Sequence, residues 1–194
     1  TPDSFSDGGM YDDAAEAADH ARQMIHDGAS IVDVGGESTR PGAAEVSEVE
    51  EMRRTIPVVE AIRRDSSVII SIDTRKAAVA RRAIEAGASI VNDVSAMTHD
   101  AEMAGVIAGS GAGIVLMHMR GNPRTMQNSP TYEDVLREVC DRLGERLDAC
   151  RKAGINADQT VLDPGIGFGK TLDHNLALLA GIPSLRRLGR PVLI

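Results

Sequence analysis

The stretch EAGASIVNDV, residues 85–94, contains the pattern from which the fold can be predicted. A polar helical stretch ends at a glycine, a short apolar run follows, and a polar residue stands where that run stops. The same order recurs in DGASIVDVG (27–35) and GSGAGIVLMHM (109–119), and the letters GASIV begin at both Gly28 and Gly87. Further strand-like runs are VIISID (68–73), TVLD (160–163) and PVLI (191–194). The sequence therefore predicts six strands built from repeated αβ units.

Helical patterns separate these runs, at residues 13–27, 46–64, 75–86, 100–109, 132–153 and 172–187. Strict alternation of helices with nearly continuous apolar strands predicts a parallel α/β sheet covered by helices. A doubly wound sheet and a (β/α)8 TIM barrel both fit this pattern. The barrel is favoured because chemically active residues follow nearly every strand instead of gathering at one switch point. These residues are Asp33, Asp73, Asn92 with Asp93, His118 and Asp163.

Six strands do not close an eight-stranded barrel. We therefore expect residues 1–194 to be a single but partial domain that holds about strands 2 to 7. An incomplete barrel has open sheet edges and an uncovered apolar interior. The isolated polypeptide is accordingly expected to be unstable, poorly soluble and inactive.

Composition excludes several classes of protein. The net charge is -8, from 21 Lys and Arg against 29 Asp and Glu, and the chain has no basic run, which argues against a nucleic-acid partner. It has no apolar stretch of the roughly 20 residues that span a bilayer, and its first residues do not resemble a signal peptide. We expect a cytoplasmic protein without a membrane partner. Cys140 and Cys150 lie too far apart on one expected helix for a disulfide and are interpreted as buried small hydrophobes.

The aromatic residues are few, and their positions are informative. Phe5 and Phe168 both lie in glycine-rich segments rather than in an aliphatic core. Side chains in such places either stack on a planar ligand or anchor a loop, and the sequence leaves both open.

Three polar side chains stand at the ends of predicted strands. Asp73, Asn92 and Asp163 occupy equivalent positions, where period-two alternation would place them on a common face. Together they could bind a heterocycle with adjacent N–H, NH2 and C=O groups. The alternative is that such residues cap the following helix, an interpretation that remains open for Asp73 and is preferred for Asp33.

Two loops carry further chemistry. GGESTRPG (35–42) combines glycines, hydroxyls and Arg40, which suits phosphate or carboxylate oxygens, although a solvated surface turn is the alternative. DPGIGFGKT (163–171) ends like a Walker A loop but lacks its first glycine at the required spacing, so a nucleotide loop is excluded. Its glycines would still allow a ligand to approach the backbone closely, beside Phe168 and Lys170.

The segment VLMHMRG (115–121) brings His118 to the end of a strand. No Ser or Cys nucleophile stands at a recognisable spacing from it, so a structural, hydrogen-bonded histidine is expected. Met117 and Met119 flank this strand end and could wall an apolar slot.

Six segments, taken in order, resemble the motif series of the dihydropteroate synthase family: TPDSFSDGG, VDVGGESTRPG, SIDT, IVNDVSA, LMHMRGNPRTMQ and DPGIGFGKT. The resemblance extends over nearly the whole chain. Any one of these motifs is weak, but six in the family's order are specific.

The resemblance implies a transferase of folate biosynthesis that joins (7,8-dihydropterin-6-yl)methyl diphosphate to 4-aminobenzoate, with Mg2+ as cofactor. It also implies a sulfonamide target and a homodimer when complete. Carried over by motif, the pterin-binding residues are Asp73, Asn92, Met117 and Asp163, and the 4-aminobenzoate pocket contains Phe5, Thr39, Pro41 and Phe168. Thr39 and Arg40 belong to the loop that meets the diphosphate, and Asp7 to the first loop; these three are the expected catalytic residues.

The family's metal-binding Asn would precede Thr1, so no metal ligand is expected on this chain. Two other functions remain open: a catalytically silent pterin-binding paralogue and a methyltetrahydrofolate:corrinoid methyltransferase. The loop GESTRPG argues against the methyltransferase, which has no use for it.

Overall fold

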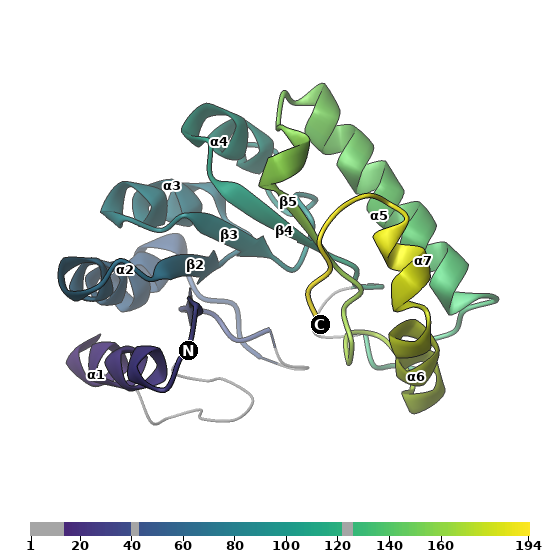
Figure 1. Cartoon of the computed structure of the whole chain (residues 1–194), viewed down its shortest axis with the longest axis horizontal. Coiled ribbons are helices and arrows are strands. Elements are labelled where there is room, and N and C mark those ends of the chain that lie inside the picture. The colour runs from purple at the N-terminus through teal and green to yellow at the C-terminus, as the bar shows by residue number, and fades with distance from the viewer. Residues whose placement is uncertain (1–13, 40–42, 122–125) are drawn as a thin grey trace.

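The computed structural model describes residues 14–39, 43–121 and 126–194, which form one curved parallel sheet with helices along it (Figure 1). The strands are β1 (Ile31–Gly35), β2 (Ile69–Asp73), β3 (Ile90–Asp93), β4 (Gly113–Met117) and β5 (Thr160–Asp163). They lie side by side in sequence order, β1-β2-β3-β4-β5, and all pairs are parallel. A doubly wound sheet reverses its strand order at a switch point, whereas a barrel does not. The order therefore confirms a partial (β/α)8 barrel.

Each strand is followed by helical structure, as the sequence predicts. The helices are α1 (Ala14–His26), α2 (Glu48–Asp65), α3 (Ala77–Ala86), α4 (Met103–Ser110), α5 (Val135–Lys152), α6 (Leu172–Ala180) and α7 (Ile182–Arg186), with a 3-10 turn η1 (Ala157–Gln159) before β5. The single helix expected over 172–187 is divided at Gly181. Pro183 begins the new helix, because its missing N–H and constrained φ suit a first turn and not a helix interior.

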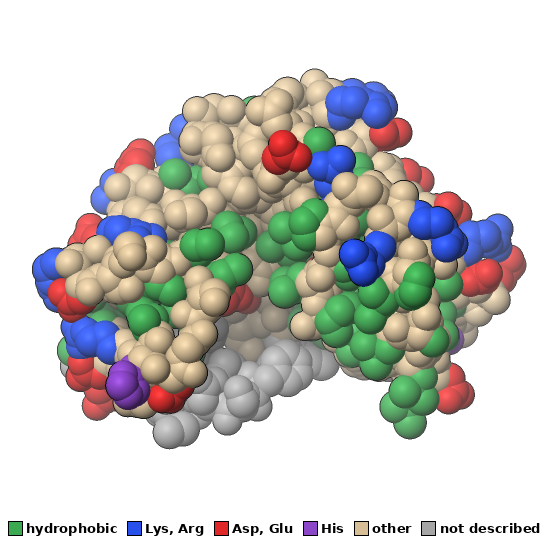
Figure 2. Space-filling view, viewed as in Figure 1, with side chains coloured by type: hydrophobic (Ala, Val, Ile, Leu, Met, Phe, Trp, Pro, Cys, Tyr) green, Lys and Arg blue, Asp and Glu red, His purple; other side chains and the backbone are tan. Residues whose placement is uncertain are grey.

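The two faces of the sheet differ in exposure. On the outer face, Ile70, Ile72 and Val91 are completely buried beneath the helices, together with Ile114, Leu116 and Leu162. On the inner face, Ile31 and Ile69 are paired in register and are 49% and 43% exposed. Figure 2 shows hydrophobic side chains gathered around the hollow of the visible face. The core of the described chain is thus the layer between sheet and helices.

The sixth predicted strand, at residues 191–194, is wrong. Only Val192 pairs with β5, through a single parallel bridge to Leu162. Leu162 donates its N–H to the carbonyl of Pro191 (2.9 Å), and Leu193 donates to the carbonyl of Leu162 (2.8 Å). Pro191 has no N–H to extend the ladder, so pairing is limited to this point.

Two smaller expectations are confirmed. Gly87 ends α3 in the left-handed conformation, with φ of 116°, and hands the chain on to β3, as the repeated GASIV segment predicts. Cys140 and Cys150 are both free, as expected, but only Cys150 is fully buried, and burial raises the pKa of its thiol to about 11. Within the described ranges, no helix has the length and apolarity needed to cross a membrane.

Candidate functional site

The register of the sheet brings the predicted polar residues to one edge and one face. Asp73 is paired with Asn92, and Met117 is paired with Asp163, at the carboxyl ends of four adjacent strands. Residues in register on parallel strands project to the same side of a sheet. Asn92 also aligns with Val115, two residues before Met117, so all four side chains share the inner face. The predicted convergence of Asp73, Asn92 and Asp163 is confirmed.

Asn92 has one half of its amide engaged and the other half open. Its Nδ2 donates a hydrogen bond of 3.1 Å to Oδ2 of Asp33. Its Oδ1 is buried and has no hydrogen-bond partner among the described residues. An acceptor in this state is costly unless a ligand or water donates to it. The atom therefore marks a place where a ligand N–H would bind.

The preferred interpretation of Asp33 as a helix cap is wrong. Asp33 lies in the middle of β1, flanked by Val32 and Val34, and its carboxylate orients the Asn92 amide. The alternation of this segment was the signal that could have placed it on the inner face. Asp33 thus joins the candidate site.

Asp73 does not cap the helix that follows β2 either. The N–H of Ala77, at the start of α3, donates to Oδ2 of Asp100 (2.8 Å), and the N–H of Lys76 donates to Oγ1 of Thr74 (3.2 Å). Burial raises the pKa of Asp73 well above its ordinary value, and the negative charges of Asp33, Glu51 and Asp93 raise it further. A carboxyl group with a raised pKa can either donate or accept a hydrogen bond. It therefore suits a ligand that carries both donors and acceptors.

Asp163 ends β5 and is partly buried. Its Oδ1 accepts a hydrogen bond of 2.7 Å from the N–H of Gly165. Burial raises its pKa, opposed by this hydrogen bond and by the charge of Lys170. Because Oδ1 is hydrogen-bonded to the turn that follows β5, Oδ2 is the oxygen left for a ligand.

The loop after β5 is held against the end of β4 by Lys170. Its Nζ donates to the carbonyls of Phe168 (2.9 Å) and His118 (3.2 Å) and lies 3.1 Å from Nδ1 of His118. Burial lowers the pKa of Lys170 to about 8, and burial together with the Lys170 charge lowers that of His118 to about 4. His118 is therefore a buried, hydrogen-bonded structural residue, as predicted, and Phe168 is a partly buried member of the same loop.

The loop after β1 has a brace that the sequence reading missed. The Glu37 carboxylate is bound by Nε and Nη2 of Arg75 (3.1 and 2.8 Å), by Nζ of Lys76 (2.6 Å) and by the N–H of Val46 (2.9 Å). Burial opposes its ionisation, yet these donors lower its pKa on balance. Glu37 thus joins both ends of the segment 38–45 to α3. The two cationic partners of Glu37, Arg75 and Lys76, are adjacent in sequence and closely follow Asp73. This pair of cations was the only hint in the sequence that a carboxylate would bind there.

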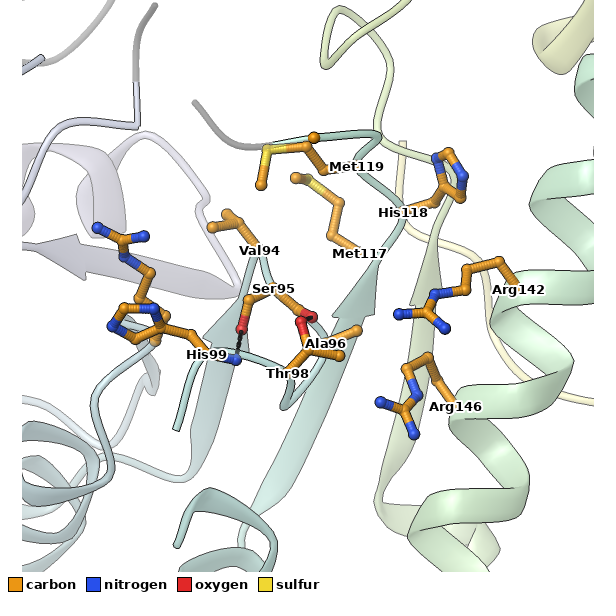
Figure 3. Close-up of a pocket in the computed structure, with 12 residues that line it drawn as sticks. Val94, Ser95, Ala96, Thr98, His99, Met117, His118, Met119, Arg142 and Arg146 are labelled. Atoms are coloured by element: carbon orange, nitrogen blue, oxygen red, sulfur yellow. Dashed lines mark hydrogen bonds between the residues drawn. The ribbon is translucent and has the colours of Figure 1, made fainter. Parts of the chain in front are cut away.

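A cavity of about 350 Å³ opens at the ends of β3 and β4 (Figure 3). Met117 and Met119 line it, but the cavity is not the apolar slot that the sequence suggests, because arginines and other polar side chains line it as well. The other lining residues belong to the loops after β2, β3 and β4 and to α5: Arg75, Val94, Ser95, Ala96, Thr98, His99, His118, Gly121, Arg142 and Arg146.

Four predicted site residues, Phe5, Asp7, Arg40 and Pro41, lie outside the described residues. Thr39 is partly buried in the loop after β1. Within the described ranges, no group of three or more His, Cys, Asp or Glu side chains is placed to hold a metal ion.

This architecture, a parallel barrel segment with acidic and amide side chains at the carboxyl ends of its strands, has known counterparts. The sequence profile of the family described as pterin binding enzyme matches residues 1–194, the whole chain. The chain belongs to this family of enzymes.

Its relatives within the family are dihydropteroate synthases. The protein from Synechocystis sp. is 48% identical over 194 residues, covering all of this chain and 67% of the relative. The Yersinia pestis enzyme, solved with a sulfonamide drug complex, superposes with a TM-score of 0.95 at 44% identity, over 98% of this chain and 69% of the other. The Xanthomonas albilineans enzyme, solved with 4-aminobenzoic acid, superposes with a TM-score of 0.88 at 42% identity, over 97% of this chain and 66% of the other. The chain thus spans about two thirds of their length.

Proposed function

We propose that this protein is a dihydropteroate synthase, which condenses (7,8-dihydropterin-6-yl)methyl diphosphate with 4-aminobenzoate to give 7,8-dihydropteroate and diphosphate. The observation that carries the proposal is the Asn92 amide, whose buried Oδ1 is open while Asp73 stands beside it in register. Its relatives' common name supports the same reaction.

Recognition of the pterin follows from the donor and acceptor pattern of the inner face. Asn92 accepts from a ring N–H or amino group, and its orientation is set by Asp33. Asp163 offers Oδ2 to a neighbouring donor, since Oδ1 is engaged with Gly165. Asp73, whose pKa is raised, either donates a hydrogen bond to the ring edge or accepts one from it. Met117, buried beside Asp163 in register, supplies an apolar contact to the ring face.

The reaction needs positive charge near the departing diphosphate and an apolar place for the aryl amine. We assign the first to Arg40 with Thr39, and the second to Phe168 with Phe5 and Pro41. Asp7 belongs to the first loop. If the bond to diphosphate breaks before the amine attacks, fixed carboxylates near the methylene cation matter more than a general base. Sulfonamides, as analogues of 4-aminobenzoate, would occupy the same place.

Mg2+ is proposed as the cofactor, and it would neutralise charge on the leaving diphosphate. Mg2+ commonly takes one or two protein carboxylates, with phosphate oxygens and water as its other ligands. Because the described residues do not assemble a metal site, no step is assigned to the ion. A homodimer and a cytoplasmic location are likewise proposals.

The test of the pterin site is Asp163→Asn in the complete gene product that contains this chain. Charge-assisted hydrogen bonds become neutral ones, which should weaken binding of the pterin diphosphate by about 10- to 100-fold, equivalent to roughly 1.5 to 3 kcal/mol. Calorimetry measures this affinity, and Asp141→Asn, an exposed position on α5, is the control. Equal affinity in both variants would remove Asp163 from the site.

The reaction itself is tested by assaying the unmodified protein for dihydropteroate. Product formation supports the synthase. Pterin binding without product would identify a silent paralogue, and methyl transfer from methyltetrahydrofolate to a corrinoid would identify the methyltransferase.

A further inference from the structure

The charged side chains that line the cavity at the ends of β3 and β4 are all positive. Its charged lining residues are Arg75, Arg142 and Arg146, and no lining residue in the described ranges is acidic. The whole chain carries a net charge of -8, so this concentration of cations is against the overall trend. The carboxyl and amide groups assigned to the pterin, Asp73, Asn92 and Asp163, are not among the lining residues.

Arg146 is the cation without a partner. It forms no ion pair with any described residue, and its Nε is buried without a hydrogen bond. Among the described residues, Arg142, one helical turn earlier, is paired only with Glu145 (2.9 Å), whose side chain is 64% exposed and therefore screened by water. A buried guanidinium N–H that lacks an acceptor is unfavourable, so an anion in the cavity would relieve this cost.

Figure 3 shows Arg142 and Arg146 extending from the helix toward the loop that contains Ala96 and Thr98. The Asp93 carboxylate holds this loop, since it accepts from the N–H and hydroxyl of Ser95 (2.8 and 2.6 Å) and from the N–H of Met97 (2.7 Å). Ala96 and Met97 are both left-handed, with φ of 51° and 61°. The wall opposite the arginines is therefore fixed before any ligand arrives.

We propose that Arg142 and Arg146 form a binding site for a phosphate dianion, either free or as the terminal group of a small phosphate ester. Two guanidinium groups at i and i+4 balance two negative charges, and each carries N–H donors of the kind that bind phosphate oxygens. The apolar floor of Met117, Met119 and Val94 leaves space for the body of an ester, within a volume at the lower end of ordinary ligand pockets.

The first experiment is calorimetric titration of the complete gene product with inorganic phosphate and, separately, with glycerol 3-phosphate. The double variant Arg142→Gln/Arg146→Gln should bind the preferred anion at least tenfold more weakly than Arg137→Gln/Arg151→Gln. The control removes the same charge from α5 at two sites that are exposed and paired with acidic residues. Phosphate that binds only at the proposed diphosphate site would bind both double variants equally, and this result would overturn the inference.

A second measurement requires no variant that might fail to fold. Phenylglyoxal modifies accessible arginines, and peptide mass spectrometry reports each position separately. Phosphate or glycerol 3-phosphate should slow modification of Arg142 and Arg146 but leave Arg137 and Arg151 unchanged. Equal rates at Arg146 with and without both anions would overturn the proposal, and this outcome is independent of whether the protein makes dihydropteroate.

Discussion

Gly165, in the turn after β5, has φ of 70°, and a side chain there would overlap the backbone carbonyl of His118. Gly154 has a similar φ of 83° but open space around it. Gly165→Ala should therefore lower the free energy of unfolding by about 2 kcal/mol or more beyond the loss in Gly154→Ala. Chemical denaturation of the complete gene product measures both. Equal losses would show that backbone strain alone, and not close packing, requires glycine at position 165.

The buried His118 should make the protein less stable in acid. Its folded-state pKa is lowered to about 4, so between pH 6.5 and 4 the unfolded chain binds more protons at this position than the folded chain. The contribution of His118 to the free energy of unfolding is thus fully present above pH 6.5 and is lost as the pH falls toward 4. In His118→Gln the loss between pH 7 and 4.5 should be smaller by about 2 to 3 kcal/mol. Denaturation curves at both pH values decide this; parallel losses in the two proteins would contradict the burial of a neutral histidine.

At the scale of elements, the Glu37 brace couples the loop after β1 to α3. Lys76 also reaches Glu51 of α2, which is only 1% exposed, so three elements meet at this network. Removing one member of a buried charge network leaves the others uncompensated. The position of Thr39 should therefore depend on Glu37.

Glu37→Gln in the complete gene product is expected to reduce dihydropteroate formation at least tenfold, with pterin affinity within about twofold of the unmodified protein. The reason is that the variant weakens the contacts of Glu37 with Val46, Arg75 and Lys76 but leaves the inner face of the sheet unchanged. Glu45→Gln is the matched control, because Glu45 contacts the same Arg75 (3.3 Å) but is 69% exposed. Steady-state kinetics and pterin calorimetry separate the effects. A similar loss in both variants would mean that Glu37 has no special positioning role.

At the scale of the whole molecule, the inner face of the sheet combines the polar site with exposed aliphatic side chains. Ile31 and Ile69 are both large and about half exposed. Exposed apolar surface on a sheet promotes association. The isolated 194-residue polypeptide should therefore aggregate, and Ile31→Thr/Ile69→Thr should increase its soluble, monomeric fraction. Size-exclusion chromatography with light scattering provides the measurement; a monomeric parent polypeptide would refute the expectation.

The sequence alone determined the repeated αβ pattern, the positions of five strands and the polar residues at their ends. These features follow from local periodicity, because strand alternation and glycine helix ends are encoded within a few neighbouring residues. It also indicated the residues that a pterin site would require. The division of the helix at 172–187 was also signalled locally, by Gly181 and Pro183, and was missed. The extent of pairing at residues 191–194 depends on contacts with β5 and was not predictable in this way.

Only the tertiary structure decided which neighbours these residues meet. The folded sheet brings the Asp33 side chain on β1 to the Asn92 side chain on β3, although 59 positions separate them in sequence, and leaves Oδ1 of Asn92 open. Long-range packing joined Glu37 to Arg75 and Lys76 and brought α5 against the loop after β3. Periodicity states which face of an element a residue occupies, but not which element lies opposite. That partner is set by the closing of the sheet and by the competition of all side chains for the same space.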